Sequence, residues 1–560
     1  MLVRSVLLLV SLLTIPVAVS QTVTDPEATV QQLFAHRAGD DTPGALVAVV
    51  QDGEIVHQEA FGMANLTHGI PYTLDTRTNI GSTSKQFTAF AIGLLAERGE
   101  LRLDDDVRDH IPELPDFGET VTLRHLLTHT SGYREFLNTL LVEGRRLDEG
   151  DYIDREEILR VVQRQPELQN TPNTEWNYNN TGYALLTEVV RRVTDQSFPE
   201  WMAENVFAPL GMDDTFVRSG PGAIIPNSAQ GYEATDSGWR EVRDLGAGTS
   251  MGAGGIYTTV GDLATWMTTL QTRAFSGAVI DQMTTPHELA TGEMTEYGLG
   301  LFIDEMSGQP RIHHGGADAA HRSMFAFFPD LNAGVIVLTN SEADAGGLAG
   351  KTIRAFFGEA FGESASDPTT PIASSTVDFV PETFDAYAGS YALEVAPDFV
   401  LTFRRDGDRY LILPSGQAES EVFPTSDSTF ASRIVEASVT FHRDADGEVR
   451  SLTLHQNGHH RATRVDAESE ADASSMDLSP YAGRYFSDEL ETLYTLTVED
   501  GELVATHIRT GSETLQHTDG DTFSAGMITV EFVRDASGAV GAFTVDIGRS
   551  RGIRFERFDS

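Results

Sequence analysis

Cysteine is absent from the 560-residue sequence, and lysine is almost absent: only Lys85 and Lys351 stand among 39 basic residues. The lack of cysteine excludes disulfides, a thiol nucleophile, cysteine zinc sites and a lipid anchor on cysteine, so packed cores must hold each domain together. The scarcity of lysine makes its two positions informative. A desolvated lysine can lose its proton and act as a base, whereas arginine cannot, although an arginine-rich composition could also leave stray lysines.

Positive charge is scarce as well, because 84 acidic residues give a net charge of -45 at pH 7. A surface this acidic repels nucleic acid and anionic membranes, so we expect neither as a partner. It is the kind of solvated surface that a salt-tolerant organism uses.

Long hydrophobic runs are also missing. No segment reaches the roughly 18 apolar residues that cross a bilayer. Residues 1–20 instead combine Arg4, an apolar stretch at 6–13 and small residues at 18–20 before Gln21, the pattern of a cleaved export signal. We therefore expect an exported protein, periplasmic or secreted, with no membrane span.

Two composition changes divide the rest of the chain. Residues 364–376 are rich in Ser, Thr and Pro, and residues 466–476 are acidic and small, as linkers are. The resulting blocks are 21–363, 377–465 and 478–560. The second contains YAGSY and the third YAGRY near its start, and both continue with short alternating stretches and Asp-Gly turns. We predict two small antiparallel β-barrels or sandwiches of one type.

The first block mixes strand and helix patterns. A hairpin is indicated by apolar stretches on either side of Asp52-Gly53. The expected strands are 45–50, 54–61, 297–303, 311–314, 323–328 and 334–339; the expected helices are 84–98, 123–127, 182–192 and about 349–359. Terminal strands around a helical middle predict an α+β fold with one sheet built from both ends of the block.

A serine and a lysine with catalytic spacing occur in Ser82-Thr83-Ser84-Lys85. Gly81 permits a tight turn into the helix, and Ser82 in the first turn places its amide among the unpaired N–H donors. A spacing of three puts Lys85 on the same helix face as Ser82. Burial and neighbours must lower the lysine pKa before it can take the hydroxyl proton. The alternative is a capping serine beside a surface lysine.

Two other segments match catalytic motifs. Residues 248–252 fit the G-x-S-x-G elbow around Ser250, with Asp262 and His314 following in triad-compatible order, but the glycine-rich surroundings favour a loop. Residues 345–352 fit a phosphate loop around Lys351 with Ala in first position. Export away from nucleotides and a nearby domain end favour an ordinary helix start there.

Three ordered motifs carry a family resemblance: residues 82–85, Tyr178-Asn179-Asn180 and His314-Gly315-Gly316. With these motifs, residues 28–360 resemble the serine β-lactamase and penicillin-binding-protein superfamily, in its H-x-G form. The two C-terminal β-domains resemble those of the D-stereospecific aminopeptidases, which are similar to class C β-lactamases with two added barrels. The resemblance implies an α+β, β-lactamase-like domain, an antiparallel sheet with flanking helices, followed by two small antiparallel β-barrels.

The same resemblance implies the catalytic roles. Ser82 would attack an acyl carbonyl to form an acyl-enzyme, and Lys85 would activate it. Tyr178 would shuttle the proton to the leaving group, a task that suits a phenolate beside a lysine. Asn180 would hold Lys85 and the substrate amide.

Substrate-binding residues are implied on the third motif. His314 takes the place of the family's lysine, and Gly315 and Gly316 would let the strand approach the substrate. The Ala317 amide, with that of Ser82, would form the oxyanion hole. His313 is the alternative to His314 if the register differs by one, although alternation directs it to the other face.

The remaining histidines suggest no metal site. His129 and Ser131 are interpreted as structural, and His459-His460 lack a third ligand, so we expect no metal and no cofactor. His314, neutral near pH 7, anchors a carboxylate less well than lysine, unless Arg322 supplies a cation.

These observations predict a serine hydrolase of small peptides, amides or esters that contain D-amino acids. The alternatives are a β-lactamase or carboxylesterase on the same scaffold and, from another class, a non-catalytic binding protein. Assembly into a homo-oligomer is left open.

Overall fold

The computed structural model describes residues 25–361, 379–465 and 476–558. Short gaps in these ranges fall at 147–149, 221, 236, 243–250, 380, 394–395, 408, 415–419, 427, 433–437, 445–446 and 456–458. The predicted export signal and the linker at 364–376 lie outside the described residues, as does all but the last residue of the linker at 466–476. The domain boundaries stay predictions.

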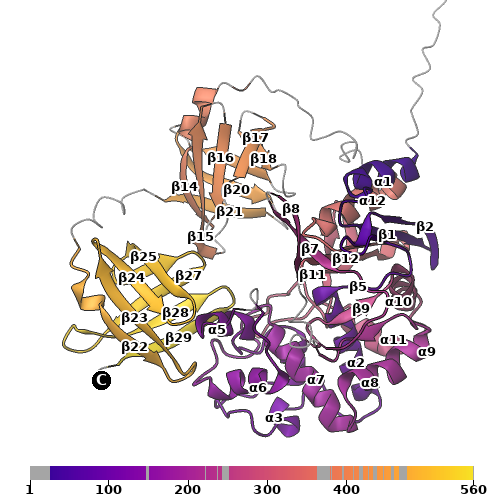
Figure 1. Ribbon diagram of the computed structural model, residues 1–560, viewed down its shortest axis with the longest axis horizontal. Helices are drawn as coiled ribbons and strands as arrows, with labels where there is room; N and C mark the ends of the chain where they lie inside the picture. Colours follow the sequence, from indigo (N-terminus) through magenta and orange to yellow (C-terminus); the bar gives the residue numbers. More distant parts are fainter. Residues whose placement is uncertain are drawn as a thin grey trace, which may run out of the picture.

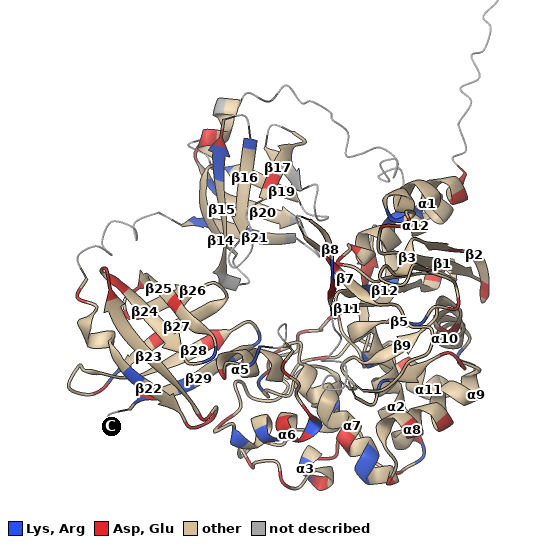
Figure 2. Ribbon diagram, viewed as in Figure 1, with Lys and Arg blue, Asp and Glu red and all other residues tan. Residues whose placement is uncertain are grey.

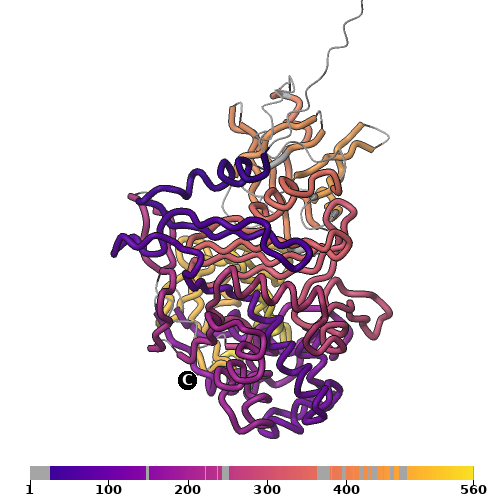
Figure 3. Tube along the Cα trace, turned by 90° about the vertical axis from the view of Figure 1, so that its right-hand side faces the viewer, coloured from indigo at the N-terminus to yellow at the C-terminus, as the bar shows by residue number. Residues whose placement is uncertain are grey.

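One six-stranded antiparallel sheet forms the centre of the first domain, in the order β10-β11-β12-β13-β1-β2. Its strands are β1 (Ala45–Gln51), β2 (Glu54–Phe61), β10 (Phe302–Met306), β11 (Gln309–Asp318), β12 (His321–Phe328) and β13 (Ala333–Thr339). The N-terminal strand β1 pairs along its length with β13, so segments almost 300 residues apart lie side by side (Figure 3). The prediction of one sheet built from both ends is confirmed.

Helices cover both faces of this sheet (Figure 1). Alternate β1 residues separate the two layers: Leu46, Ala48 and Val50 face one core, and Ala45 and Val47 face the other. The first core holds α2 (Lys85–Glu97), α7 (Asn180–Thr194) and α10 (Val260–Thr272), whereas the second holds α1 (Pro26–Phe34) and α12 (Ala345–Phe357). The helical middle of the block therefore lies on one face, and the two terminal helices on the other.

Shorter elements complete the domain. The helices are α3 (Val107–His110), α4 (Leu123–Leu127), α5 (Phe136–Val142), α6 (Arg155–Arg164), α8 (Phe198–Met202), α9 (Ala208–Leu210) and α11 (Gly277–Met283). The strands are β3 (Met63–Asn65), β4 (Ile70–Pro71), β5 (Thr78–Asn79), β6 (Phe216–Val217), β7 (Gly231–Thr235), β8 (Gly238–Val242) and β9 (Ile256–Thr258). Within the described residues, none of the helices is long and apolar enough to span a bilayer.

Several expected boundaries are wrong, among them the end of the strand expected at 311–314, which runs from Gln309 to Asp318; two others have a clear structural cause. The strand expected from 297 begins only at Phe302, because Gly300 adopts a φ of 76° and turns the chain against the carbonyl of Lys85. The last helix begins at Ala345, not near 349. Asp344 caps it by accepting a hydrogen bond of 2.8 Å from the Gly347 amide. The phosphate-loop lookalike is thus helical from its first residue, and Lys351 is exposed on that helix.

Two closed eight-stranded antiparallel barrels follow, as the resemblance implied. The first is built from β14 (Gly389–Leu393), β15 (Ala396–Asp406), β16 (Arg409–Pro414), β17 (Ser420–Pro424), β18 (Thr429–Ser432), β19 (Ser438–Arg443), β20 (Val449–His455) and β21 (His459–Val465). The second is built from β22 (Gly483–Ser487), β23 (Thr492–Glu499), β24 (Glu502–His507), β25 (Gly511–Asp519), β26 (Thr522–Ala525), β27 (Ile528–Arg534), β28 (Val540–Ile547) and β29 (Ser550–Arg557).

The repeated tyrosine motif makes the same hydrogen bond in both barrels. The Tyr391 hydroxyl donates to the carbonyl of Tyr387 at 2.9 Å, and Tyr485 repeats this bond to Tyr481. All four tyrosines are buried in their barrel cores. The two barrels are therefore of one type, as predicted.

The second barrel docks on the catalytic domain through α5. Strands β28 and β29 contact this helix, and Val142 at its end belongs to the barrel core (Figure 1). The hairpin between β28 and β29 is thereby brought to the helical side of the catalytic domain.

Candidate active site

Ser82 lies in a 3-10 turn, Gly81–Ser84, directly before α2. Gly81 has a φ of 50°, and a Cβ there would lie 2.6 Å from the Ala317 amide nitrogen of β11. A Cβ on Gly316 would lie 1.9 Å from the carbonyl oxygen of Ile80. Both glycines are needed because β11 packs directly against the serine turn. The resemblance implied that Gly316 lets the strand approach the substrate. In the structure, the close neighbour of Gly316 is the Ile80 backbone beside the serine turn.

The Lys85 side chain is completely buried and makes three polar contacts. Its Nζ lies 3.2 Å from Ser82 Oγ, 2.8 Å from Asn180 Oδ1 and 2.9 Å from the carbonyl oxygen of Ala253. Burial lowers the pKa of Lys85 well below its usual value. A neutral amine has two N–H groups and one lone pair. The two carbonyl-type acceptors use both N–H groups, so the lone pair is left for the hydroxyl of Ser82.

Glu135 fixes the orientation of the Asn180 amide. Asn180 Nδ2 donates to Glu135 Oε1 at 2.9 Å, so Oδ1 is the atom that faces Lys85. Glu135 is fully buried and also caps α5, accepting from the Asn138 amide at 3.0 Å. Sequence reasoning missed Glu135. Its one local signal, a position before a helical apolar run, indicates only a helix cap.

Tyr178 lies over the lysine. The Lys85 Nζ is 4.7 Å from the centre of the Tyr178 ring, and the His129 ring is 4.3 Å away on centroids. Burial raises the pKa of Tyr178 above its usual value and outweighs the opposite effect of the nearby Ser82 side chain. Tyr178 is therefore a phenol at neutral pH, not the phenolate considered from the sequence.

His314 is buried in β11 with both ring nitrogens engaged. Nδ1 lies 2.6 Å from the Gly315 carbonyl oxygen, and Nε2 lies 3.2 Å from the Tyr297 hydroxyl. Burial lowers the pKa of His314 to about 3. The ring is thus neutral at pH 7. His313 points elsewhere and lies 3.1 Å from Asp304, which agrees with strand alternation.

His129 holds the segment that carries Tyr178 and Asn180. Its backbone has a φ of 61°, and Nδ1 accepts a hydrogen bond of 3.0 Å from the Asn179 amide. Asn179 in turn caps α7 by accepting from the Gly182 amide at 2.9 Å. This contact fits the structural interpretation of His129. Ser131 accepts a hydrogen bond from the Tyr133 amide at 3.3 Å.

The other candidates that the structure describes are not part of this cluster. Ser250 lies outside the described residues, but the glycines after it lead into strand β9, not the helix an elbow needs. Asp262 accepts from Thr215 at 2.7 Å. Arg322 is engaged with Glu342 at 2.7 Å. Of the residues described, no three His, Asp or Glu side chains are grouped to hold a metal ion; the His459 side chain is not described.

A residue of the second barrel also reaches this site. The Arg549 guanidinium carbon, in the β28–β29 hairpin, lies 5.1 Å from the centre of the Tyr178 ring. After burial, the charge of Arg549 is the next cause of the low Lys85 pKa. Sequence reasoning missed Arg549 because it is more than 370 positions from Tyr178 along the chain.

A family model described as Beta-lactamase matches residues 30–358. The chain belongs to the β-lactamase family. As a member with this site, the protein is a serine hydrolase. A second model, a domain of unknown function (DUF3471), matches residues 467–558, which include the second barrel.

Several relatives match this β-lactamase-family protein over most of its length. A D-aminopeptidase of Brucella anthropi is 26% identical over 536 residues, covering 92% of this chain and 95% of that protein. Penicillin-binding protein 4* of Bacillus subtilis is 26% identical over 443 residues, covering 76% of this chain and 96% of that protein. The octameric penicillin-binding protein homologue of Pyrococcus abyssi shares the fold, with a TM-score of 0.55 and 24% identity, covering 78% of this chain and 99% of that one.

Proposed function

We propose that the protein is an exported serine hydrolase that acts, through an acyl-enzyme, on small peptides, amides or esters containing D-amino acids. The observation that carries the proposal is the placement of the buried Lys85 amine, whose lone pair is left for the Ser82 hydroxyl. The similarity to D-aminopeptidases over 92% of the chain supports the choice of substrate. Residues 1–20 support export.

Acylation follows from these groups. Neutral Lys85 takes the proton of the Ser82 hydroxyl as Oγ bonds to the carbonyl carbon. The amides of Ser82 and Ala317 stabilise the resulting oxyanion; Ala317 is exposed on β11 beside the serine turn. Tyr178, a phenol, donates its proton to the leaving nitrogen or oxygen as the carbonyl–leaving-group bond breaks, and regains a proton from Lys85. Water then attacks the acyl-enzyme with the same groups in reverse roles.

A neutral His314 bears on the choice between substrates. It takes the β11 position of the charged anchor that a lysine would offer to a β-lactam carboxylate, and the similarity to D-aminopeptidases favours amide hydrolysis over β-lactam hydrolysis. A carboxylesterase is the other alternative on this scaffold.

Active-site labelling tests the hydrolase directly. A fluorophosphonate is expected to label the wild-type protein and not Ser82→Ala, while Ser250→Ala keeps the label. An unlabelled wild-type protein contradicts the hydrolase, and loss of label in Ser250→Ala revives the elbow. Substrate choice is tested by turnover of D-alanine p-nitroanilide, its L-enantiomer, nitrocefin and a nitrophenyl ester. Nitrocefin turned over fastest would contradict the preference stated above.

Self-association is a separate property to measure. The Pyrococcus abyssi homologue is described as octameric. Multi-angle light scattering of the full-length protein would establish whether this chain forms a homo-oligomer.

A further inference from the structure

The β28–β29 hairpin of the second barrel is fixed at the active site by its backbone. The carbonyl oxygen of Arg549 accepts hydrogen bonds from Asn177 Nδ2 at 3.1 Å and Gln169 Nε2 at 3.2 Å. Its amide donates to Asn138 Oδ1 at 3.2 Å. All three partners belong to the catalytic domain, and Asn177 directly precedes Tyr178. Three such bonds fix the Arg549 backbone close to the catalytic tyrosine.

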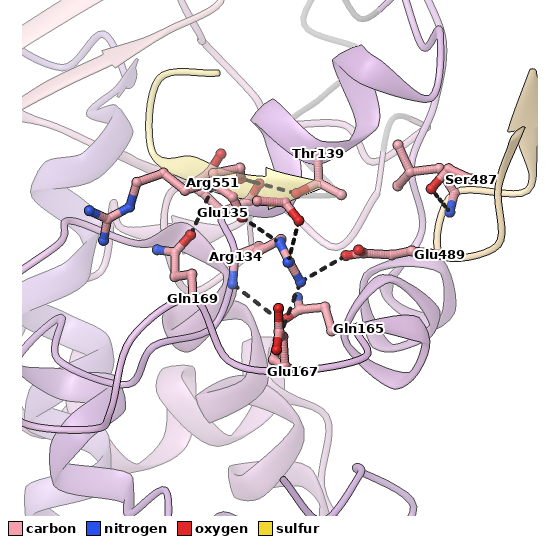
Figure 4. Close-up of polar contacts among 12 residues, drawn as sticks. Arg134, Glu135, Thr139, Gln165, Glu167, Gln169, Ser487, Glu489 and Arg551 are labelled. Atoms are coloured by element: carbon pink, nitrogen blue, oxygen red, sulfur yellow. Dashed lines mark hydrogen bonds and ion pairs between the residues drawn. The ribbon is translucent and has the colours of Figure 1, made fainter. Parts of the chain in front are cut away.

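The next residues of the hairpin are fixed in the same way. The Arg551 amide donates to Gln169 Oε1 at 3.1 Å, and Arg134 donates to the carbonyl oxygens of Arg551 and Gly552 at 2.9 and 3.1 Å (Figure 4). Hydrogen bonds therefore hold the tip of the hairpin, residues 549–552, on the catalytic domain.

Among the described residues, the guanidinium of Arg549 has no carboxylate partner and donates no hydrogen bond; it lies over the face of the Tyr178 ring. Other arginines nearby are occupied: Arg551 pairs with Glu175 at 2.7 Å, and Arg134 with Glu489 at 3.2 Å. The hairpin thus presents one unpaired, half-buried cation next to the reacting groups.

We propose that Arg549 binds a carboxylate of the substrate, so that the hydrolase prefers D-amino-acid substrates carrying a carboxylate close to the scissile bond. The inference rests on the proposed function and deepens it. A guanidinium offers paired N–H donors that match a carboxylate. Such a cation is needed locally, because His314 is neutral and a protein of net charge -45 repels anions.

Two positions of the carboxylate are compatible with this contact. It lies either on the leaving group, as in a free dipeptide, or on the acyl side chain, as in a D-glutamyl substrate. Two isosteric pairs of substrates distinguish these two positions. D-alanyl-D-alanine is compared with its C-terminal amide for the leaving group, and the α-anilide of D-glutamate is compared with that of D-glutamine for the acyl side chain.

The variant Arg549→Gln is compared with Arg551→Gln, which removes the same charge from the same hairpin. Each protein is assayed on the plateau of its own pH profile, so that a change in Lys85 protonation does not enter. We expect wild type to prefer the member with the carboxylate in one pair by about 10-fold to 100-fold in kcat/KM, the range of a hydrogen bond to a charged group. Arg549→Gln should abolish that preference by lowering kcat/KM for the carboxylate member, and Arg551→Gln should keep the preference.

The outcomes separate this inference from the proposed function. Turnover without a preference in either pair overturns the inference alone. So does an Arg549→Gln variant that lowers both members of a pair equally, because this is the result expected of an arginine that only supports the Tyr178 ring. Fluorophosphonate labelling at the wild-type rate establishes that the variant is folded. A wild-type protein that is labelled at Ser82 but turns over none of the four substrates contradicts the proposed function itself.

Discussion

Arg134 and Glu489 form an ion pair, 3.2 Å between Nη1 and Oε1, that is almost completely buried between the catalytic domain and the second barrel (Figure 4). The adjacent Glu135 contacts both sides of the same interface. Its carbonyl oxygen accepts from the Ser550 hydroxyl at 2.9 Å, and its carboxylate orients Asn180. Two consecutive residues therefore connect the docked barrel to the amide that orients Lys85.

The buried carboxyl of this pair predicts a pH-dependent stability. Burial raises the pKa of Glu489 to about 7 from its ordinary value of 4.5, and Arg134 offsets this only in part. Between these values the folded state binds more protons than the unfolded state, so the stability from Glu489 is full below about 4.5 and is lost as the pH rises through 7. At roughly 1.4 kcal/mol per pH unit, the loss is about 3 kcal/mol.

Urea unfolding of wild type and Glu489→Gln between pH 5 and 8 measures how the contribution of Glu489 to stability depends on pH. The wild-type free energy of unfolding should fall more steeply with pH than that of the variant. Glu491→Gln, on an exposed pair with Arg164, is the matched control and should follow wild type. Parallel curves for wild type and Glu489→Gln would contradict the assignment.

The two lysines provide a second test. Lys85→Arg keeps a positive charge but cannot take the serine proton, so we expect the rate of Ser82 acylation to fall by about 100-fold to 10,000-fold. In the control variant Lys351→Arg, which changes an exposed residue of α12, Ser82 should be labelled at the wild-type rate. Stopped-flow labelling with a fluorophosphonate measures both. An active Lys85→Arg enzyme would exclude Lys85 as the base.

Much of the fold could be predicted because local patterns determine it. The hairpin at Asp52-Gly53, the helix at 123–127 and the repeated YAG-Y segments each carry their own signal. Motif order along the chain was enough to select Ser82, Lys85, Tyr178 and Asn180, which the structure brings together.

What could not be predicted depends on tertiary packing. The sequence shows a glycine at 316, but it does not show that this glycine packs against the backbone of Ile80. The protonation of Tyr178 follows from burial, which no motif encodes. Glu135 and Arg549 reach the site from α5 and from another domain, and neither lies in a catalytic motif.

The pH profile of the reaction is a third prediction. Only neutral Lys85 activates Ser82, so kcat/KM should rise with pH and reach a plateau. Burial, and then the Arg549 charge, lower the pKa of Lys85, so the midpoint should lie well below 10.5. Removing the charge in Arg549→Gln should move the midpoint to higher pH. Profiles measured with an ester or anilide that has no titrating group would show this shift; coincident profiles would mean that Arg549 does not act on Lys85.

The amide orientation of Asn180 can be tested through Glu135. In Glu135→Ala the amide loses the acceptor that fixes it and can present Nδ2 to the Lys85 amine, which has no spare acceptor for it. We expect kcat to fall about 5-fold to 100-fold, the effect of one lost buried hydrogen bond. Glu135→Gln retains an acceptor oxygen and should keep most of the activity. Equal losses in both variants would point instead to the carboxylate charge.

The acidic surface predicts that salt stabilises the protein. Acidic residues occur in the catalytic domain and in both barrels (Figure 2). Salt weakens favourable ion pairs as well as repulsion, but even with every basic residue paired the sequence leaves 45 acidic residues over, so repulsion is the larger effect. Raising the salt from 0.1 M to 1 M shortens the screening length from about 10 Å to about 3 Å. The urea midpoint should therefore increase over this range, and an unchanged or falling midpoint would show that the charges are already compensated at low salt.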